Sequence, residues 1–265
     1  MLKFLTKAII FLGVVVGAIT FVYLYDLYQE IKDDIDSVVN YNPKQSTQFF
    51  DKNGKLLANT FKDENREYVN YDDIPARVIE GLVAIEDTQF FEHFGVNPDA
   101  ISRAVIKNIQ SGGYSEGAST LTQQLIKVLL LSREKKIIRK VKEALLAIRL
   151  ETVLTKEEIL ERYLNHVYFG HGYYGVKTAA KGYFKKNLYE LTLKEIAILV
   201  GLPRAPSFYD PTKNLQVSLA RANQVITRMH TLGWINNEQF EESINETPTI
   251  YNQTLTQNIA PYAID

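Results

Sequence analysis

The sequence predicts a mainly α protein with an N-terminal transmembrane helix and a small β element ahead of the helical body. Three observations support this expectation: an uncharged apolar stretch at residues 8–25, a hairpin pattern within residues 45–71, and helical periodicity from residue 73 onward. The chain has 265 residues, a net charge of −1 and no cysteine. This composition gives no indication of a nucleic-acid partner, and it excludes disulfides and cysteine-based metal sites.

The first element is a membrane anchor, expected over residues 1–29. Residues 8–25 carry no charge and, together with Phe4 and Leu5, reach the length that a bilayer-spanning helix needs. Lysines precede the apolar stretch and acidic residues follow it, which predicts a single-pass anchor with a cytoplasmic tip. The alternative is a cleaved signal peptide, which the long apolar run and the lack of a small-x-small cleavage site disfavour.

Residues 30–72 are expected to form a stalk and a small β element. Residues 30–42 are polar and favour a helical stalk. Within residues 45–71, apolar side chains flank Asn53 and Gly54, and this pattern is typical of a hairpin with an Asn-Gly turn.

The helical body is expected over residues 73–245, because β-rich runs are few after residue 73. Two capping boxes precede apolar runs in this part, Thr155 with Glu158 and Thr192 with Glu195. These boxes mark two helix starts.

Glu86 is the first candidate for chemistry. It falls in a predicted helix over residues 75–91, four residues after Leu82 and eight after Val78, on or beside the face that should be buried. A buried carboxylate is costly unless it is paired, hydrogen-bonded or protonated, and burial should raise its pKa. A raised carboxyl pKa suits general acid–base catalysis near neutral pH, whereas the alternative is a structural, salt-bridged glutamate.

Five short motifs follow one another along the chain. They are Glu-Asp-Thr-Gln-Phe-Phe-Glu-His-Phe-Gly at 86–95, Gly-Ala-Ser-Thr-Leu-Thr-Gln-Gln at 117–124, Arg-Lys-Val-Lys-Glu-Ala-Leu-Leu-Ala-Ile-Arg-Leu-Glu at 139–151, Glu-Glu-Ile-Leu-Glu-Arg-Tyr-Leu-Asn-His-Val-Tyr-Phe-Gly at 157–170, and Leu-Val-Gly-Leu-Pro-Arg-Ala-Pro at 199–206. In this order and spacing they resemble the motifs of the peptidoglycan glycosyltransferases, glycosyltransferase family 51. The resemblance covers about residues 45–215.

The resemblance implies a lysozyme-like fold in two lobes, a globular head and a smaller membrane-facing jaw. It implies polymerisation of lipid II into glycan strands, with inversion at MurNAc C1 and release of undecaprenyl pyrophosphate. The implied location is the bacterial cytoplasmic membrane with the catalytic domain on the periplasmic side. The implied partners are lipid II, the growing glycan chain and the membrane, and other cell-wall synthesis proteins stay open.

The resemblance also implies roles for individual residues. Glu86 would be the catalytic base, and Glu143 a second catalytic carboxylate beside a clamp for pyrophosphate. The basic residues of the clamp are Lys127, Arg133, Lys135, Arg139 and Lys140. The other substrate-binding candidates are Asp87, Ser119, Thr120, Gln123, Gln124 and Asn165.

Several of these residues have alternative interpretations. Helix-start capping would explain Ser119 or Thr120, although not a pair of glutamines. Asp87 either supports the local hydrogen bonds or shares a proton with Glu86. Several family members carry arginine where this chain has Lys135, and lysine lacks the bidentate fork of arginine.

The basic helix edge around Glu143 also has an alternative interpretation. Arg139 and Lys140 lie four and three residues before Glu143, so all three can share one edge of a helix. An ordinary solvated helix with salt bridges would show the same spacing.

The lipid-facing surface is expected at residues 125–131, where an apolar run abuts a basic stretch, and the alternative there is core burial. The four histidines lie far apart and indicate no metal site. A divalent cation, Mg or Mn, held through Glu86, Asp87 or the pyrophosphate stays open.

Residues 246–265 are expected to form a linker, because residues 258–265 resemble the linker that leads into the transpeptidase domain of class A bifunctional penicillin-binding proteins. Ser132 and Lys135 match a Ser-x-x-Lys nucleophile motif by chance, since no Lys-Thr-Gly follows. Two rival functions are a glycan-cleaving lytic transglycosylase and a membrane-anchored scaffold. The dense basic run near Glu143 disfavours the first, because a cleaving enzyme holds no pyrophosphate.

Overall fold

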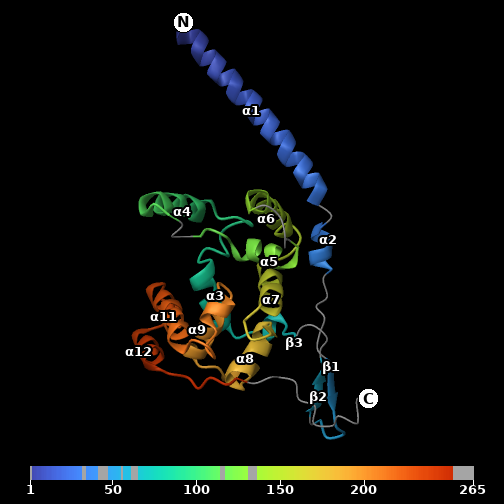
Figure 1. The fold of residues 1–265 in the computed structure, drawn as a ribbon, viewed down its shortest axis with the longest axis vertical. Coiled ribbons are helices and arrows are strands. Elements are labelled where there is room, and N and C mark those ends of the chain that lie inside the picture. The colour runs from blue at the N-terminus through green and yellow to red at the C-terminus, as the bar shows by residue number, and fades with distance from the viewer. Residues whose placement is uncertain are drawn as a thin grey trace.

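The protein is mainly helical in the computed structural model, which describes residues 2–31, 34–40, 47–54, 56–60, 65–113, 117–130 and 136–252 (Figure 1). The helices are α1 (Leu2–Ile31), α2 (Asp34–Val39), α3 (Ala76–Glu86), α4 (Pro98–Ser111), α5 (Leu121–Leu129), α6 (Lys136–Leu150), α7 (Lys156–His166), α8 (Val176–Phe184), α9 (Leu193–Gly201), α10 (Pro206–Tyr209), α11 (Leu215–Thr231) and α12 (Asn237–Asn245). Two short 3-10 turns join them, η1 (Tyr71–Asp73) and η2 (Leu188–Glu190). The expectation of a mainly α body is confirmed.

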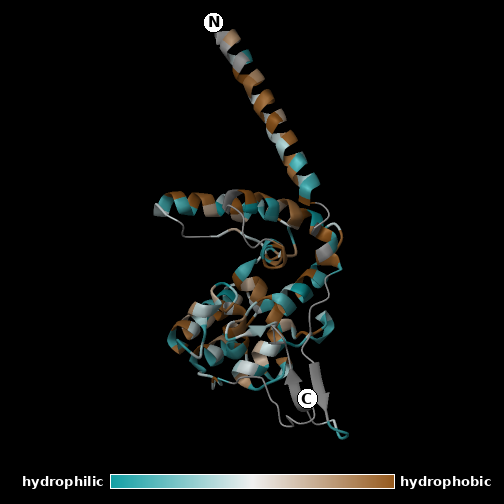
Figure 2. Ribbon diagram, turned by 45° about the vertical axis from the view of Figure 1, so that its right-hand side comes forward, coloured by the Kyte–Doolittle hydropathy of each residue, from teal (hydrophilic) through white to brown (hydrophobic). Residues whose placement is uncertain are grey.

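Helix α1 projects away from the body and is apolar along much of its length (Figures 1 and 2). Its segment Ile9–Ile31 is long and apolar enough to cross a membrane, judged by length and composition. The foot of the helix rests on the body, because Leu27 and Ile31 are buried there. Lys142 of α6 donates a hydrogen bond to Glu30, with 3.2 Å between Nζ and Oε1. Helix α1 is therefore attached to the helix that carries Glu143.

The predicted stalk is helical where it is described, since α2 spans Asp34–Val39. Not all of its side chains face solvent, although its composition is mostly polar. Ile35 and Val38 are almost completely buried and belong to the main hydrophobic core. The stalk thus packs on the body with one apolar side.

The predicted hairpin is confirmed. Strands β1 (Thr47–Phe50) and β2 (Leu56–Thr60) pair antiparallel on either side of the Asn-Gly turn, with an irregularity in register between Phe49 and Phe50. A second pair was not predicted. Strand β3 (Asn65–Arg66) pairs in parallel with β4 (Tyr173–Tyr174), and strands of two residues are too short to show a period of two.

The core forms where α3 packs against α9 and α11, and where α5 packs against α6 and α7. Leu82, Leu121, Leu164 and Leu199, one from each of four helices, are completely buried in one continuous cluster. The predicted capping boxes at Thr155 and Thr192 are both present. Local capping and apolar packing together therefore fix the ends and the orientation of these helices.

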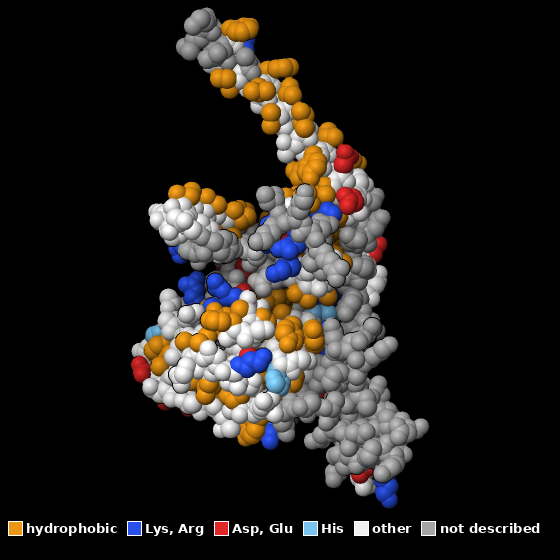
Figure 3. All heavy atoms as spheres, viewed as in Figure 1, with side chains coloured by type: hydrophobic (Ala, Val, Ile, Leu, Met, Phe, Trp, Pro, Cys, Tyr) orange, Lys and Arg blue, Asp and Glu red, His pale blue; other side chains and the backbone are white. Residues whose placement is uncertain are grey.

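Helix α4 lies apart from this core, and only Ala104 on it is buried. Ile101, Val105 and Ile109, each one turn after the last, are exposed along one face, and Ile106 is exposed beside them. Figure 3 shows an apolar surface along the upper side of this helix, at the end of the body from which α1 rises. This apolar face has no partner among the described residues.

The expected lipid-facing run at residues 125–131 needs a correction. Leu125 and Ile126 are buried in the core, and Leu129 and Leu130 are partly buried against it. Val128 is half exposed, and residue 131 lies outside the described residues. The run is mostly core because α5 packs against both α6 and α7.

Beyond α12 the chain is described up to residue 252. The backbone nitrogen of Tyr251 donates to the carbonyl of Tyr183, at 2.8 Å, so this part runs beside α8. The rest of the predicted linker, residues 253–265, lies outside the described residues.

Candidate active site

Glu86 is the last residue of α3 and lies where two adjoining cavities meet. The helix ends there because Asp87 leaves the helical conformation, with φ of −158° and ψ of 74°. One cavity has a volume of about 630 Å³ and the other of about 570 Å³, and Glu86, Ser119 and Arg204 line both. Figure 3 shows lysine and arginine side chains gathered in the hollow below α4 and α6.

The Glu86 carboxylate is nearly buried and is held by two hydrogen-bond donors. Its Oε1 pairs with the Arg221 guanidinium at 3.0 Å, and its Oε2 accepts a hydrogen bond from the Gln124 amide at 3.1 Å. Burial raises the pKa of Glu86, as the sequence predicted, while the Gln124 hydrogen bond and the charges of Arg221 and Arg204 act in the opposite direction. Glu86 thus combines burial, which raises its carboxyl pKa, with contacts that favour its ionised form.

Gln124 is itself oriented from behind. The buried hydroxyl of Tyr163 on α7 donates to Oε1 of Gln124 at 3.0 Å, which leaves the amide nitrogen facing Glu86. The phenol stays protonated, because burial raises the pKa of Tyr163 well above its ordinary value.

The 570 Å³ cavity is bounded by the cationic edge of α6. Glu143 is 1% exposed and pairs with Nε of Arg139 at 3.3 Å and with Nζ of Lys140. Lys140 also donates to the Ser119 hydroxyl at 2.7 Å, and Lys127 lines the same cavity. The prediction that Arg139 and Lys140 share one helix edge with Glu143 is confirmed. The structure brings this edge and Glu86 to one cavity.

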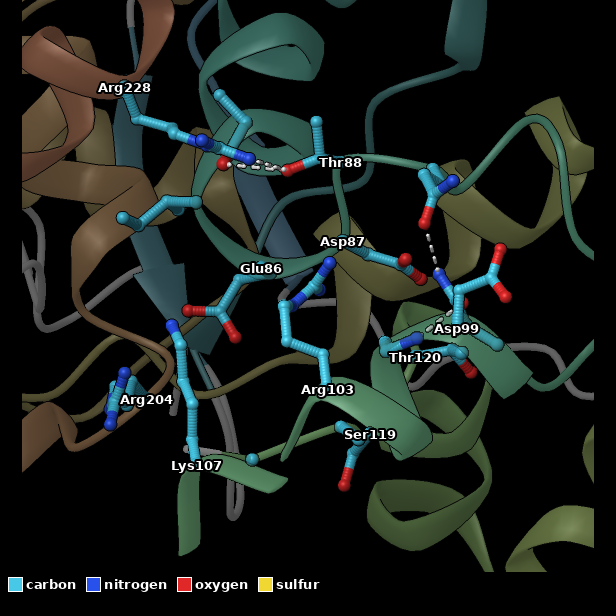
Figure 4. A pocket seen from close by; sticks show the side chains of 17 residues that line it. Glu86, Asp87, Thr88, Asp99, Arg103, Lys107, Ser119, Thr120, Arg204 and Arg228 are labelled. Carbon is cyan, nitrogen blue, oxygen red and sulfur yellow. Dashed lines mark hydrogen bonds between the residues drawn. The ribbon is translucent and has the colours of Figure 1, made fainter. Parts of the chain in front are cut away.

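The 630 Å³ cavity lies on the other side of Glu86 and has cations of its own (Figure 4). Arg103 and Lys107 reach into it from α4, on the helix face opposite to the exposed isoleucines. Arg228 of α11 also lines it and donates to the Thr88 hydroxyl at 3.1 Å. These residues were not predicted from the sequence, although the spacing of Arg103 and Lys107 by one helical turn was a usable signal.

Two more cations close to Glu86 were not predicted from the sequence. Arg204 lies within the fifth motif but was not assigned a role there, and Arg221 lies outside every motif. Arg221 pairs with Glu86 across a separation of 135 residues, which no local pattern can indicate.

Asp87 joins three segments of the site. Its Oδ2 lies 2.9 Å from Nε2 of His93 and accepts a hydrogen bond from the backbone nitrogen of Leu121 at 3.0 Å. The Thr120 hydroxyl donates to the carbonyl of Gly95 at 2.6 Å. Of the two interpretations that the sequence left open for Asp87, these contacts support the one in which it organises the local hydrogen bonds, with His93 as a partner.

Thr120 and Gln123 close the N-terminus of α5 as a capping box. Capping therefore explains one of the two glutamines as well as Thr120, and Gln124 is the glutamine that contacts Glu86. Gln123 still lines the smaller cavity and Thr120 the larger one.

Three of the predicted residues are placed away from the cavities or lie outside the described residues. Asn165 is completely buried, and it exchanges hydrogen bonds of 2.9 and 2.7 Å with the backbone of Val69. This position supports the connection between α7 and the segment before η1. Arg133 and Lys135 lie outside the described residues.

The chemistry of a divalent cation has little support in the residues around Glu86. Across the described ranges there is no group of three or more His, Asp or Glu side chains that could hold a metal ion. The oxygens of Glu86 already accept from Arg221 and Gln124, and Oδ2 of Asp87 contacts His93 and Leu121. Both oxygens of Glu86 and one oxygen of Asp87 are thus already in contact with a donor.

Comparison with known proteins gives one family. A family model described as Transglycosylase matches residues 53–230. The chain is 42% identical over 241 residues to penicillin-binding protein 1A of Aquifex aeolicus (strain VF5), covering 90% of this chain and 33% of the relative. It is 41% identical over 226 residues to penicillin-binding protein 1A of Escherichia coli (strain K12), covering 84% of this chain and 26% of the relative.

Among solved structures, the crystal structure of penicillin-binding protein 1A from Haemophilus influenzae is similar, with a TM-score of 0.48 and 27% identity. The match covers 81% of this chain and 22% of that chain. The chain spans a third or less of the length of these relatives.

Proposed function

Because the chain belongs to the transglycosylase family, we propose that it is a peptidoglycan glycosyltransferase that polymerises lipid II into glycan strands. One observation carries the proposal. Glu86 is a nearly buried carboxylate held by two donors between two cavities that both carry cations. Joining two pyrophosphate-linked sugars requires one base and a cationic site for each substrate, and the arrangement around Glu86 fits that requirement.

In the proposed reaction Glu86 takes the proton from the 4-hydroxyl of the acceptor's GlcNAc. The oxygen then forms a bond to C1 of the donor's MurNAc, while the bond between C1 and the pyrophosphate oxygen breaks. The bonding electrons leave with undecaprenyl pyrophosphate, and attack from the opposite side inverts C1. A general base in this role typically accelerates the reaction about 10²–10⁴-fold.

We assign the donor to the cavity with Lys127, Arg139 and Lys140. Their charges face the position where negative charge develops on the leaving pyrophosphate, and preorganised cations stabilise such a transition state. Glu143 orients two of these cations and is buried behind them. Arg133 and Lys135 remain part of the proposed clamp.

We assign the acceptor to the cavity with Arg103 and Lys107. These side chains come from α4, whose opposite face is exposed and apolar. A helix of this kind suits the surface of a membrane, with its cations toward the substrate head group and its apolar face in the lipid. The acceptor would then stay attached to the bilayer while its sugars reach Glu86.

We further propose a lysozyme-like arrangement in two lobes, with α4 in the membrane-facing jaw and α3, α9 and α11 in the head. Helix α1 would be the single-pass anchor, with its N-terminus in the cytoplasm and the catalytic body on the periplasmic side. The proposed division is residues 1–29 for the anchor, 30–72 for the stalk and β element, 73–245 for the catalytic domain, and 246–265 for a linker toward a transpeptidase domain.

The cations also separate this proposal from a lytic transglycosylase. A glycan-cleaving enzyme needs a carboxylic acid but has no pyrophosphate to bind, so cationic groups on both sides of Glu86 would serve no purpose. A scaffold without chemistry would leave a nearly buried, donor-held carboxylate between two cavities unexplained.

Assaying the whole chain with lipid II and Glu86→Gln tests the function. The substitution keeps the shape of the side chain and removes its basicity, so polymerisation should fall about a hundredfold or more. Glu80→Gln is the matched control, since Glu80 lies on the same helix, pairs with Arg77 and lines neither cavity. Shortened glycan, no product from the wild type, or near-normal turnover in Glu86→Gln would contradict the proposal.

A further inference from the structure

We propose that Arg221 is a positioning residue that holds Glu86 ionised and aimed at the acceptor hydroxyl, from a notch that Gly201 leaves open. The inference rests on the proposed role of Glu86 as the base. It adds the residue that keeps this carboxylate ionised and correctly oriented. Arg221 lines neither cavity, so it acts through Glu86 and not on the substrate.

The Arg221 side chain is fixed by three contacts. It lies on α11, is 5% exposed, and one guanidinium nitrogen is 3.0 Å from Oε1 of Glu86. A second nitrogen donates to Gln224 at 3.2 Å, and the guanidinium carbon lies 5.7 Å from the centre of the Tyr209 ring. A group restrained in this way loses little additional freedom when it orients a carboxylate.

Gly201 provides the space for this side chain. It is the last residue of α9, and a Cβ added there would lie 2.9 Å from Cγ of Arg221. Cγ is close to the backbone of α11, so it cannot move aside as the end of a flexible chain could. Any larger residue at position 201 must therefore displace the Arg221 side chain from its present position.

The donors around Glu86 favour its ionised form and oppose the effect of burial. Arginine can only donate, and Gln124 presents its amide nitrogen because Tyr163 holds the amide oxygen. Each carboxylate oxygen therefore receives a donor, which favours the ionised form. One further lone pair on each oxygen is left for an acceptor hydroxyl.

Many charged groups surround Glu86, and Arg221 differs from the others because it touches the Glu86 carboxylate directly. The charged and titratable groups near it come from α3, α4, α5, α6, α7, α11 and the segment after α9: Asp87, Asp99, Arg103, Lys107, Lys127, Arg139, Lys140, Glu143, Tyr163, Arg204, Arg221 and Arg228. Within the described ranges, Arg221 is the group that forms an ion pair with Glu86. Burial raises the pKa of Glu86, and the charge of Arg221 opposes this.

The test is the pH profile of lipid II polymerisation by the whole chain, between about pH 5.5 and 9.5. For Arg221→Gln we expect at least a tenfold loss of kcat at pH 7, recovered as the pH rises, because more of Glu86 is then ionised. KM should stay within about twofold, since Arg221 lines neither cavity. Arg221→Lys keeps the charge and should hold the acid limb near that of the wild type.

Two other variants complete the set. Gly201→Ala keeps every charge but displaces Arg221, so its acid limb should lie between those of the wild type and Arg221→Gln. This variant also serves if Arg221→Gln does not fold. Arg149→Gln is the control, because Arg149 is exposed on α6 and contacts Thr152. Its profile should match the wild type.

A second readout does not need activity. Titration of the Glu86 carboxyl carbon by NMR, assigned by its loss in Glu86→Gln, should show ionisation at higher pH in Arg221→Gln than in the wild type. If that shift occurs but the wild type makes no polymer, the proposed function fails and the role of Arg221 stands. If the wild type polymerises but neither the limb nor the titration moves, or if kcat falls equally at every pH, Arg221 is structural and the inference is wrong.

Discussion

Gly95→Ala probes a close approach between the loop after α3 and the helix that carries Glu143. Gly95 has a φ of +76°, and a Cβ there would lie 2.6 Å from both the Ala147 carbonyl carbon and the Ile148 nitrogen. These are backbone atoms of α6, so no side-chain rotation can relieve the clash. The loop and α6 must separate by several tenths of an ångström or more.

The magnitude follows from two terms. The left-handed conformation costs an alanine about 1–2 kcal/mol, and forced overpacking costs about 1–3 kcal/mol more. The free energy of unfolding should fall by about 2–5 kcal/mol, which lowers the Tm of a domain of this size by roughly 4–20 °C. Turnover should fall as well, because α6 carries the cations of the smaller cavity and Gly95 accepts the hydrogen bond from Thr120.

The assay is thermal unfolding of the detergent-solubilised protein, together with lipid II polymerisation well below the Tm. Gly112→Ala is the matched control, since Gly112 has a φ of +65° and nothing within 4 Å of the added Cβ. It isolates the conformational term of about 1–2 kcal/mol. If Gly95→Ala costs no more than Gly112→Ala, the loop is not pressed against α6 and the reasoning is refuted.

Three other substitutions test separate parts of the structure. Glu143→Gln removes the carboxylate that orients two cations of α6, and lipid II turnover should fall at least tenfold. Val105→Asp with Ile109→Asp should weaken vesicle binding of a version that begins at residue 26 by at least tenfold, because each buried side chain contributes about 1.5–3 kcal/mol. Burial lowers the pKa of His166 to about 4, so between about pH 6.5 and 4 the unfolded chain binds a proton that the folded chain does not bind. The free energy of unfolding therefore falls by up to about 3 kcal/mol as the pH is lowered through this range. His166→Gln removes the titrating group and should make the free energy of unfolding less dependent on pH there.

Each of these has a control. Glu80→Gln should keep normal turnover, and Tyr189→Asp, at an exposed aromatic residue outside α4, should leave vesicle binding unchanged. His171→Asn should keep the acid-dependent loss of stability. A variant in α4 that binds vesicles normally, or a His166→Gln protein with the slope of the wild type, would contradict the corresponding prediction.

Local rules were enough to predict much of the fold. Thr155 and Thr192 cap helices within three residues of themselves, and the period of 3.6 placed Glu86 beside the buried face of α3. The same rule placed Arg139 and Lys140 on the edge of Glu143. Each prediction depends only on residues less than three turns apart, and the sequence shows these directly.

The contacts that set the chemistry could not be predicted in this way. The pair of Arg221 with Glu86 depends on how α11 packs against α3, and the cations of α4 meet Glu86 only in the folded chain. The apolar run at residues 125–131 was ambiguous because burial in a core and insertion in a membrane require the same residue types. The stripe at Ile101, Val105 and Ile109 follows a period of four, and reading it would have indicated the exposed face of α4.

Because Glu30 of α1 is hydrogen-bonded to Lys142 of α6, we expect the thickness of the bilayer to affect how the active site faces the membrane. The segment from Ile9 to Ile31 has 23 residues, but Leu27 and Ile31 are packed on the body, so fewer residues are left to span a hydrocarbon core of about 30 Å. A change in bilayer thickness then changes the tilt of the helix or deforms the bilayer around it. Because the foot of α1 is packed against α6, the tilt would change the angle at which the cationic edge and the acceptor cavity face the lipid surface. Polymerisation rates in vesicles of graded acyl-chain length should therefore depend on thickness.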